Sequence, residues 1–175
     1  MKVLTIKVLT IKAPWAQAIV HGTKRIENRT WKPHSDVMGE VIALHCGKSM
    51  VRIGDYDDTA RDQLAKAQHK HLRHERGERT VRELGCIIGT ARVVGWYDVR
   101  DDTGDLDAVI DHTWLKRLAV TAVGYDLDLK IATDDPWWLG PIGWLLDDVR
   151  LAQPVEARGM PGLWTVPDEI ELVEV

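Results

Sequence analysis

Short runs of apolar residues, separated by polar or glycine-containing stretches, dominate the chain. Runs of this kind, bounded by turn residues, predict buried or half-buried strands. We expect about five to seven of them. One is a copy of the Lys-Val-Leu-Thr-Ile sequence that occurs at 2–6 and again at 7–11. The other predicted ranges are 25–29, 38–46, 86–99, 144–151, 154–157 and 163–166, with 169–175 as an additional edge strand.

Three stretches predict helix instead. The first begins at Pro14, whose fixed φ suits a first helical turn, and it places Trp15 and Ile19 on one face. Gly22 is expected to end this helix by adopting a left-handed conformation. The other two are a polar stretch from 55 to about 84, rich in Ala, Gln, Lys, His and Arg, and the segment 108–118.

The order of these elements predicts an α+β fold. Strands and helices do not alternate regularly, and Gly89 and Gly95 mark bends inside a long apolar run. Both features favour a mixed β-barrel over a doubly wound sheet. Because the chain has 175 residues and no low-complexity linker, we expect a single domain over 1–175, with 55–84 as a helical insertion.

Composition narrows the class of protein. No apolar run reaches the length of about 18 residues that predicts a membrane span, so we expect no membrane partner. The only cysteines are Cys46 and Cys86, which argues against a disulfide framework and predicts a cytoplasmic location. The histidines of the 55–84 stretch lack the convergent partners of a zinc site, so we predict no metal and no cofactor.

Charge is distributed unevenly along the chain. The net charge of −4 and pI near 6.0 argue against a protein that grips long duplex nucleic acid by neutralising phosphates. A local cationic excess nevertheless exists, formed by Lys24, Arg25, Arg29, Lys32 and His34. This distribution fits a confined anionic partner, such as a nucleotide or a short single strand.

The strand predicted at 25–29 has charge on one face. Arg25, Glu27 and Arg29 alternate with Ile26 and Asn28, which is strand spacing. The simpler interpretation is a solvated strand face, in which Glu27 bridges the two arginines. The alternative is a binding site that uses the same side chains.

Eight tryptophans and no phenylalanine make indole the dominant aromatic group. Trp15, Trp144 and Trp164 occupy apolar positions and are expected in the core. Trp31 follows the charged strand, and the pair Trp137-Trp138 lies in a proline-bounded loop. An exposed indole can stack on a nucleobase, so Trp31 and Trp138 are candidate stacking residues. A loop indole can equally cap the barrel.

Two motifs resemble the ASCH (activating signal cointegrator homology) domain of the PUA-like superfamily. The first is Pro14-Trp15-Ala16 followed by Gly22-x-Lys24-x-x-Glu27-Asn28-Arg29-x-Trp31. The second is Gly140-Pro-Ile-Gly143-Trp144-Leu-Leu-Asp147-Asp148-Val149 with Arg158-Gly159-Met-Pro-Gly162-Leu163-Trp164. Many members have Gln where this chain has Ala13. The resemblance implies a pseudobarrel with a helix after the first strand and a cleft beside it.

One function compatible with this resemblance is binding of RNA, a nucleotide or a modified nucleobase. Lys24 and Arg29 would hold phosphate or a base edge. Glu27 and Asn28 would read exocyclic amino and carbonyl groups. Trp31 or Trp138 would stack on the base.

The alternative is a hydrolase of nucleic acid or nucleosides. In a ribonuclease, Lys24 would stabilise the charged phosphorane and Glu27 would act as general base. Relatives that deacetylate acetylated cytidine place a threonine nucleophile three residues after the lysine. This chain has Glu27 there, and a carboxylate cannot replace a hydroxyl in that scheme.

Overall fold

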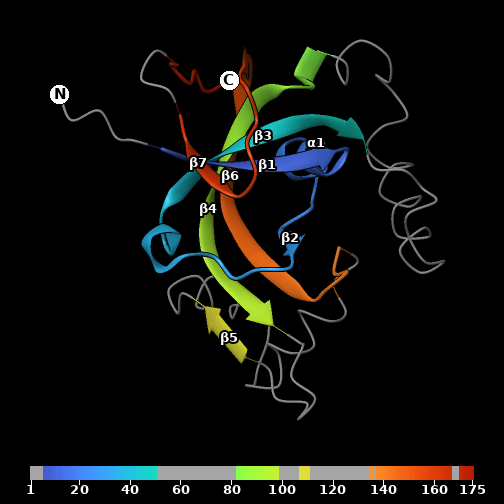
Figure 1. Ribbon diagram of the computed structural model, residues 1–175, viewed down its shortest axis with the longest axis vertical. Coiled ribbons are helices and arrows are strands. Elements are labelled where there is room, and N and C mark those ends of the chain that lie inside the picture. Colours follow the sequence, from blue (N-terminus) through green and yellow to red (C-terminus); the bar gives the residue numbers. More distant parts are fainter. Residues whose placement is uncertain (1–5, 51–81, 99–106, 111–134, 136, 167–169) are drawn as a thin grey trace. The chain divides into compact units, whose positions relative to one another are not determined.

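The computed structural model describes residues 6–50, 82–98, 107–110, 135, 137–166 and 170–175. These residues form seven strands, the short α-helix α1 and one 3₁₀ helix, and residues 82–83 are also helical. Most of the structure is mixed sheet (Figure 1). The strand order is β2-β6-β4-β3-β1-β7, with β5 paired to β4. The predicted α+β class, with a mixed sheet, is therefore confirmed.

The chain divides into two compact units. Unit 1 comprises 1–24, 41–91 and 148–175, and unit 2 comprises 25–40 and 92–147. Two long strands, β4 (Cys86–Asp98) and β6 (Ile142–Glu156), contribute residues to both units.

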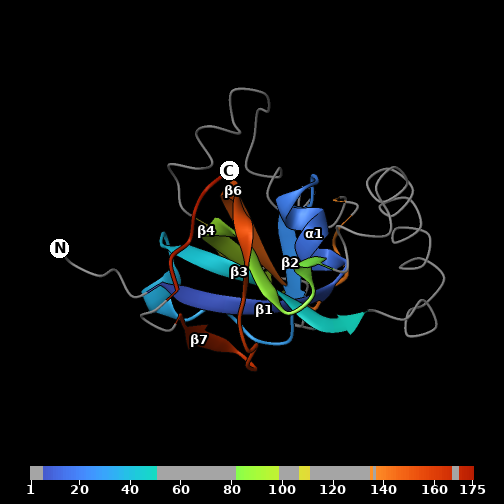
Figure 2. The ribbon, with the colours of Figure 1, turned by 90° about the horizontal axis from the view of Figure 1, so that it is seen from above.

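Unit 1 is organised around β1 (Lys7–Ala13), the second copy of the repeated sequence. It pairs in parallel with β3 (Val41–Met50) and antiparallel with β7 (Leu163–Thr165). The helix α1 (Trp15–Val20) packs against β1 and β3 (Figures 1 and 2). Apolar residues from these strands and from β4 meet in one cluster: Val8, Ala43, Ile87 and Trp164.

Unit 2 holds β2 (Ile26–Arg29), the 3₁₀ helix η1 (Ser35–Val37) and β5 (Asp107–Ile110). β2 pairs antiparallel with β6, so that Ile26 faces Leu145 and Arg29 faces Ile142. β5 pairs antiparallel with β4, from Gly95 opposite Ile110 to Asp98 opposite Asp107.

Several predicted elements need correction. The ranges 144–151 and 154–157 belong to one strand, β6, and residues 108–110 of the predicted second helix lie in β5. Pairing with β4 supplies the backbone hydrogen bonds there, and Val109 and Ile110 are β-branched residues suited to a sheet. The rest of that helix, and the predicted insertion up to residue 81, lie outside the described residues.

Gly22 also ends α1 for a different reason than predicted. Its φ is not in the left-handed region. A Cβ at this position would lie 2.5 Å from the carbonyl oxygen of Ala18, so only glycine permits the backbone to approach so closely.

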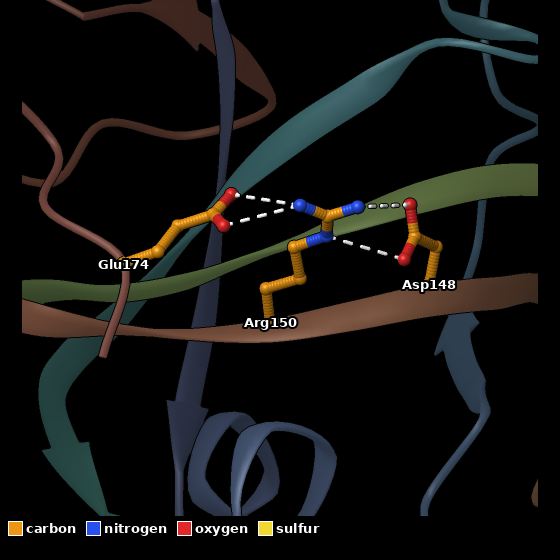
Figure 3. A network of polar contacts seen from close by, with 3 residues as sticks. All are labelled: Asp148, Arg150 and Glu174. Carbon is orange, nitrogen blue, oxygen red and sulfur yellow. Dashed lines mark hydrogen bonds and ion pairs between the residues drawn. The ribbon is translucent and has the colours of Figure 1, made fainter.

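The second half of β6 has an ionic contact on its surface (Figure 3). Arg150 binds Asp148 through Nε at 3.2 Å and Glu174 through Nη1 at 3.1 Å. An isolated bridge joins Ala152 to Glu174, in place of the strand predicted at 169–175. Asp148 has a φ of 45°, a left-handed conformation inside a strand.

Candidate functional site

The predicted site residues fall in both units. Lys24 is the last residue of the first segment of unit 1. The other five belong to unit 2: Glu27, Asn28, Arg29, Trp31 and Trp138. Lys24, the α1 residues Trp15 and Gln17, and the pair formed by His21 and Glu83 all belong to unit 1 and are called the α1 site.

Lys24 is buried, with only 1% of its surface exposed. The chain turns back after α1, and the Lys24 N–H donates to the carbonyl oxygen of Ala18 at 3.2 Å. Its ammonium Nζ lies 5.9 Å from the centre of the Trp15 ring. An indole face attracts a cation at such a distance, which offsets part of the cost of removing the ammonium from water. The predicted cation therefore points into the protein and not into bulk solvent.

Gln17 is a residue that the sequence analysis missed. It lies on α1 between Trp15 and Ile19 and is 4% exposed. Both Nε2 and Oε1 are fully buried and have no hydrogen-bond partner among the described residues. Buried amides are nearly always hydrogen-bonded, so this group is exceptional. A polar residue within an apolar helical run was the one signal in the sequence.

His21 and Glu83 form a second polar pair in the α1 site. His21 Nε2 lies 2.7 Å from Glu83 Oε1. The Glu83 side chain is 4% exposed and that of His21 is 23% exposed. Glu83 Oε2 is buried without a hydrogen-bond partner in the described part of the chain. The backbone N–H of His21 donates to the backbone carbonyl oxygen of Gln17 at 2.8 Å, so His21 lies one helical turn beyond Gln17.

Two further titratable groups of unit 1 belong to the core. His45 Nε2 bonds to the Ala157 carbonyl oxygen at 3.0 Å, and burial is the main cause that lowers its pKa. Burial also raises the pKa of Cys46 to about 12, with a smaller contribution from the charge of Glu83. Cys46 and Cys86 are both free and buried, as small core residues should be. Neither has the lowered pKa of a nucleophilic thiol.

The charged face of β2 is partly buried. Glu27 is 6% exposed, and its Oε1 lies 3.2 Å from Arg29 Nε. The Asn28 side chain forms hydrogen bonds with the loop that contains Trp137 and Leu139. Its Nδ2 donates to the Trp137 carbonyl oxygen at 2.8 Å, and its Oδ1 accepts the Leu139 N–H at 2.9 Å. Both polar ends of the Asn28 amide are thus engaged within unit 2.

The tryptophans of unit 2 pack against one another and against glycine. Trp31 meets Trp144 edge to face, with ring centres 4.7 Å apart, and Trp144 Nε1 donates to the Trp31 carbonyl oxygen. The Trp138 ring packs directly against Gly143. A Cβ on Gly143 would come within 2.4 Å of this ring. Trp31 and Trp138 are both half-buried. The expected core positions of Trp15, Trp144 and Trp164 are confirmed.

The described ranges contain no group of three His, Cys, Asp or Glu side chains that could hold a metal ion. They also contain no helix with the length and apolar character needed to cross a membrane. The histidine-rich stretch at 69–74 lies outside these ranges.

Comparison with known proteins identifies a family. The model of the ASCH domain matches residues 9–112. Among solved structures, the chain is similar to the ASCH protein of Zymomonas mobilis, at 15% identity and a TM-score of 0.42, covering 93% of this chain and 88% of that one. A serine-to-alanine mutant of the same protein matches at 15% identity and a TM-score of 0.39, covering 92% and 87%. No curated protein sequence matches.

Proposed function

We propose, since this chain belongs to the ASCH domain family, that it binds RNA, a nucleotide or a modified nucleobase through the α1 site of unit 1. The family is generally associated with RNA and nucleic-acid interaction. In this proposal Lys24 supplies the positive charge. The other predicted contact residues belong to unit 2 and are proposed as polar and aromatic contacts of that unit: Glu27, Asn28, Arg29, Trp31 and Trp138.

The observation that carries the proposal is the buried ammonium of Lys24 beside Trp15. Lysine is among the residues least often buried in proteins, so an ammonium at this depth marks an unusual position. A cation held at depth beside an aromatic ring favours a compact anionic or electron-rich ligand. The protein as a whole has a net charge of −4 and so does not attract polyanions. An anionic ligand would therefore be attracted by the positive charge of a local site.

Binding can be tested by intrinsic tryptophan fluorescence. The probes are single-stranded RNA, single-stranded DNA, CMP, AMP and acetylated cytidine. Lys24→Met keeps the length of the side chain and removes its charge. Lys12→Ala, at an exposed position of β1, removes the same charge elsewhere and is the matched control.

We expect Lys24→Met to weaken binding at least tenfold, which corresponds to about 1.4 kcal/mol. Lys12→Ala should change it less than twofold. Binding by the unmodified protein should also weaken as salt concentration rises. The proposal fails if none of the probes binds, or if the two variants bind equally well.

One observation favours the hydrolase as a second candidate, namely the His21–Glu83 pair. A carboxylate that holds one imidazole nitrogen leaves the other free to take a proton, as in many general bases. His21 Nδ1 has no hydrogen-bond partner among the residues described, and the His21 side chain is partly exposed. Glu27, in contrast, is buried and paired with Arg29. His21 is therefore better placed than Glu27 to act as the base, with Lys24 stabilising negative charge.

Product formation separates the two candidates. RNA and acetylated cytidine are incubated with the protein and with Lys24→Ala, Glu27→Gln and His21→Gln, and the products are separated by chromatography. General-base catalysis predicts that His21→Gln lowers the rate by about 10²–10⁴-fold while binding persists. Binding without any product leaves the first function, and a full rate in His21→Gln removes this residue from the mechanism.

A further inference from the structure

We infer that Gln17 recognises the polar edge of a nucleobase, so that this buried amide determines which ligands the α1 site accepts. The inference rests on the proposed function, because it concerns the same site and the same class of ligand. It adds a residue that belongs to neither of the two motifs by which the chain resembles its family.

The state of the Gln17 amide is the first argument. A side chain that is 4% exposed has lost its contact with water, yet both its donor Nε2 and its acceptor Oε1 lack a protein partner within the described ranges. Leaving such groups unsatisfied destabilises the folded state. An apolar residue of similar size would avoid this cost. A glutamine at this position is explained if a ligand satisfies both atoms.

The surroundings of Gln17 are the second argument. It lies one turn before His21, so Gln17 and the His21–Glu83 pair lie on the same side of α1. Trp15 is two residues from Gln17 and projects from a different side of the helix, where its ring lies near the ammonium of Lys24. All of these residues belong to unit 1.

The chemistry of an amide indicates the ligand class. A carboxamide presents one donor and one acceptor side by side, and it pairs with a group that presents an acceptor and a donor at the same spacing. Nucleobase edges have this arrangement, as in the pairing of glutamine with adenine. A phosphate or a sugar hydroxyl alone does not. The base of the ligand is therefore expected to contact Gln17, and its phosphate is expected to depend on Lys24.

The test compares Gln17→Leu with the unmodified protein, using CMP, AMP and ribose 5-phosphate as probes. Ribose 5-phosphate has the sugar and phosphate but no base. We expect Gln17→Leu to weaken CMP or AMP binding at least tenfold and to leave ribose 5-phosphate binding within twofold. Lys24→Met should weaken both kinds of probe. The melting temperature of Gln17→Leu should equal or exceed that of the unmodified protein, because the unsatisfied amide is gone.

Each alternative result is decisive. If the nucleotides bind Gln17→Leu as well as they bind the unmodified protein, Gln17 does not read the base and the inference is overturned. A marked fall in melting temperature for both Gln17→Leu and Gln17→Met would assign Gln17 a structural role, for example through a buried water, and would also overturn it. If no nucleotide binds the unmodified protein, the proposed function itself fails, which is a different outcome.

Discussion

Replacement of Asn28 by alanine should release the loop that follows residue 135. The side chain makes two hydrogen bonds to this loop, one to the Trp137 carbonyl oxygen at 2.8 Å and one from the Leu139 N–H at 2.9 Å. A neutral hydrogen bond contributes about 0.5–1.5 kcal/mol to stability. Removing both should therefore lower the free energy of unfolding by about 1–3 kcal/mol.

The expected change in melting temperature follows from chain length. For a protein of 150–250 residues, 1 kcal/mol corresponds to about 2–4 °C, so a loss near 2 kcal/mol should lower the melting temperature by about 4–8 °C. Urea unfolding followed by tryptophan fluorescence gives the free energy, and calorimetry gives the temperature. Ser35→Ala, at an exposed position in the same unit, is the control and should change stability by less than about 0.5 kcal/mol.

The reasoning is refuted if Asn28→Ala unfolds within about 0.5 kcal/mol of the unmodified protein. That result would mean that the loop gains as much from water as from Asn28. A loss of stability of the expected size would also alter how ligand data on this residue are interpreted. Weaker binding by Asn28→Ala could then follow from displacement of Trp138, which belongs to the same loop.

Three further predictions concern packing and titration. Gly143→Ala should destabilise the protein by about 1–3 kcal/mol in urea unfolding, because a Cβ would meet the Trp138 ring at 2.4 Å; unchanged stability would contradict this packing. Cys46, whose pKa is raised to about 12 by burial, should resist iodoacetamide at pH 8 in the folded protein and react after unfolding in urea; rapid alkylation of the folded protein would contradict it. The pKa of His45 is lowered in the folded protein, so the unfolded chain binds the proton more readily. The free energy of unfolding should therefore fall as the pH drops below 6.5. His45→Gln should make the free energy of unfolding less dependent on pH in this range, and an unchanged pH dependence would contradict the reasoning.

Most strands could be predicted because their information is local. The apolar runs that became β3 and β4 are buried in almost any packing, and the second copy of the repeat serves as β1. Residues 108–110 were assigned to a helix, because their pairing with β4 depends on a partner elsewhere in the chain. The sequence shows that a glycine is present at position 22. It does not show whether glycine is needed there for a left-handed φ or for a close approach of the backbone to Ala18.

The candidate site was predicted only in part for the same reason. Lys24 was identified from its motif, but its burial beside Trp15 depends on how the chain turns back after α1. The contact between His21 and Glu83 joins residues 62 positions apart, and no local pattern reveals it. Gln17 was missed because a single polar residue on a short helix is usually exposed, and only the packing of α1 on β1 and β3 encloses it.

The left-handed backbone at Asp148 divides β6 into two stretches with different tolerance to mutation. Residues 142–146 are buried on both faces, whereas from Asp147 onward exposed and half-buried positions alternate over several residues. A mutational scan along this strand should therefore resemble a scan of two separate strands. Asparagine or glycine should be accepted at position 148, and valine or isoleucine, which are favoured elsewhere in sheets, should be rejected there.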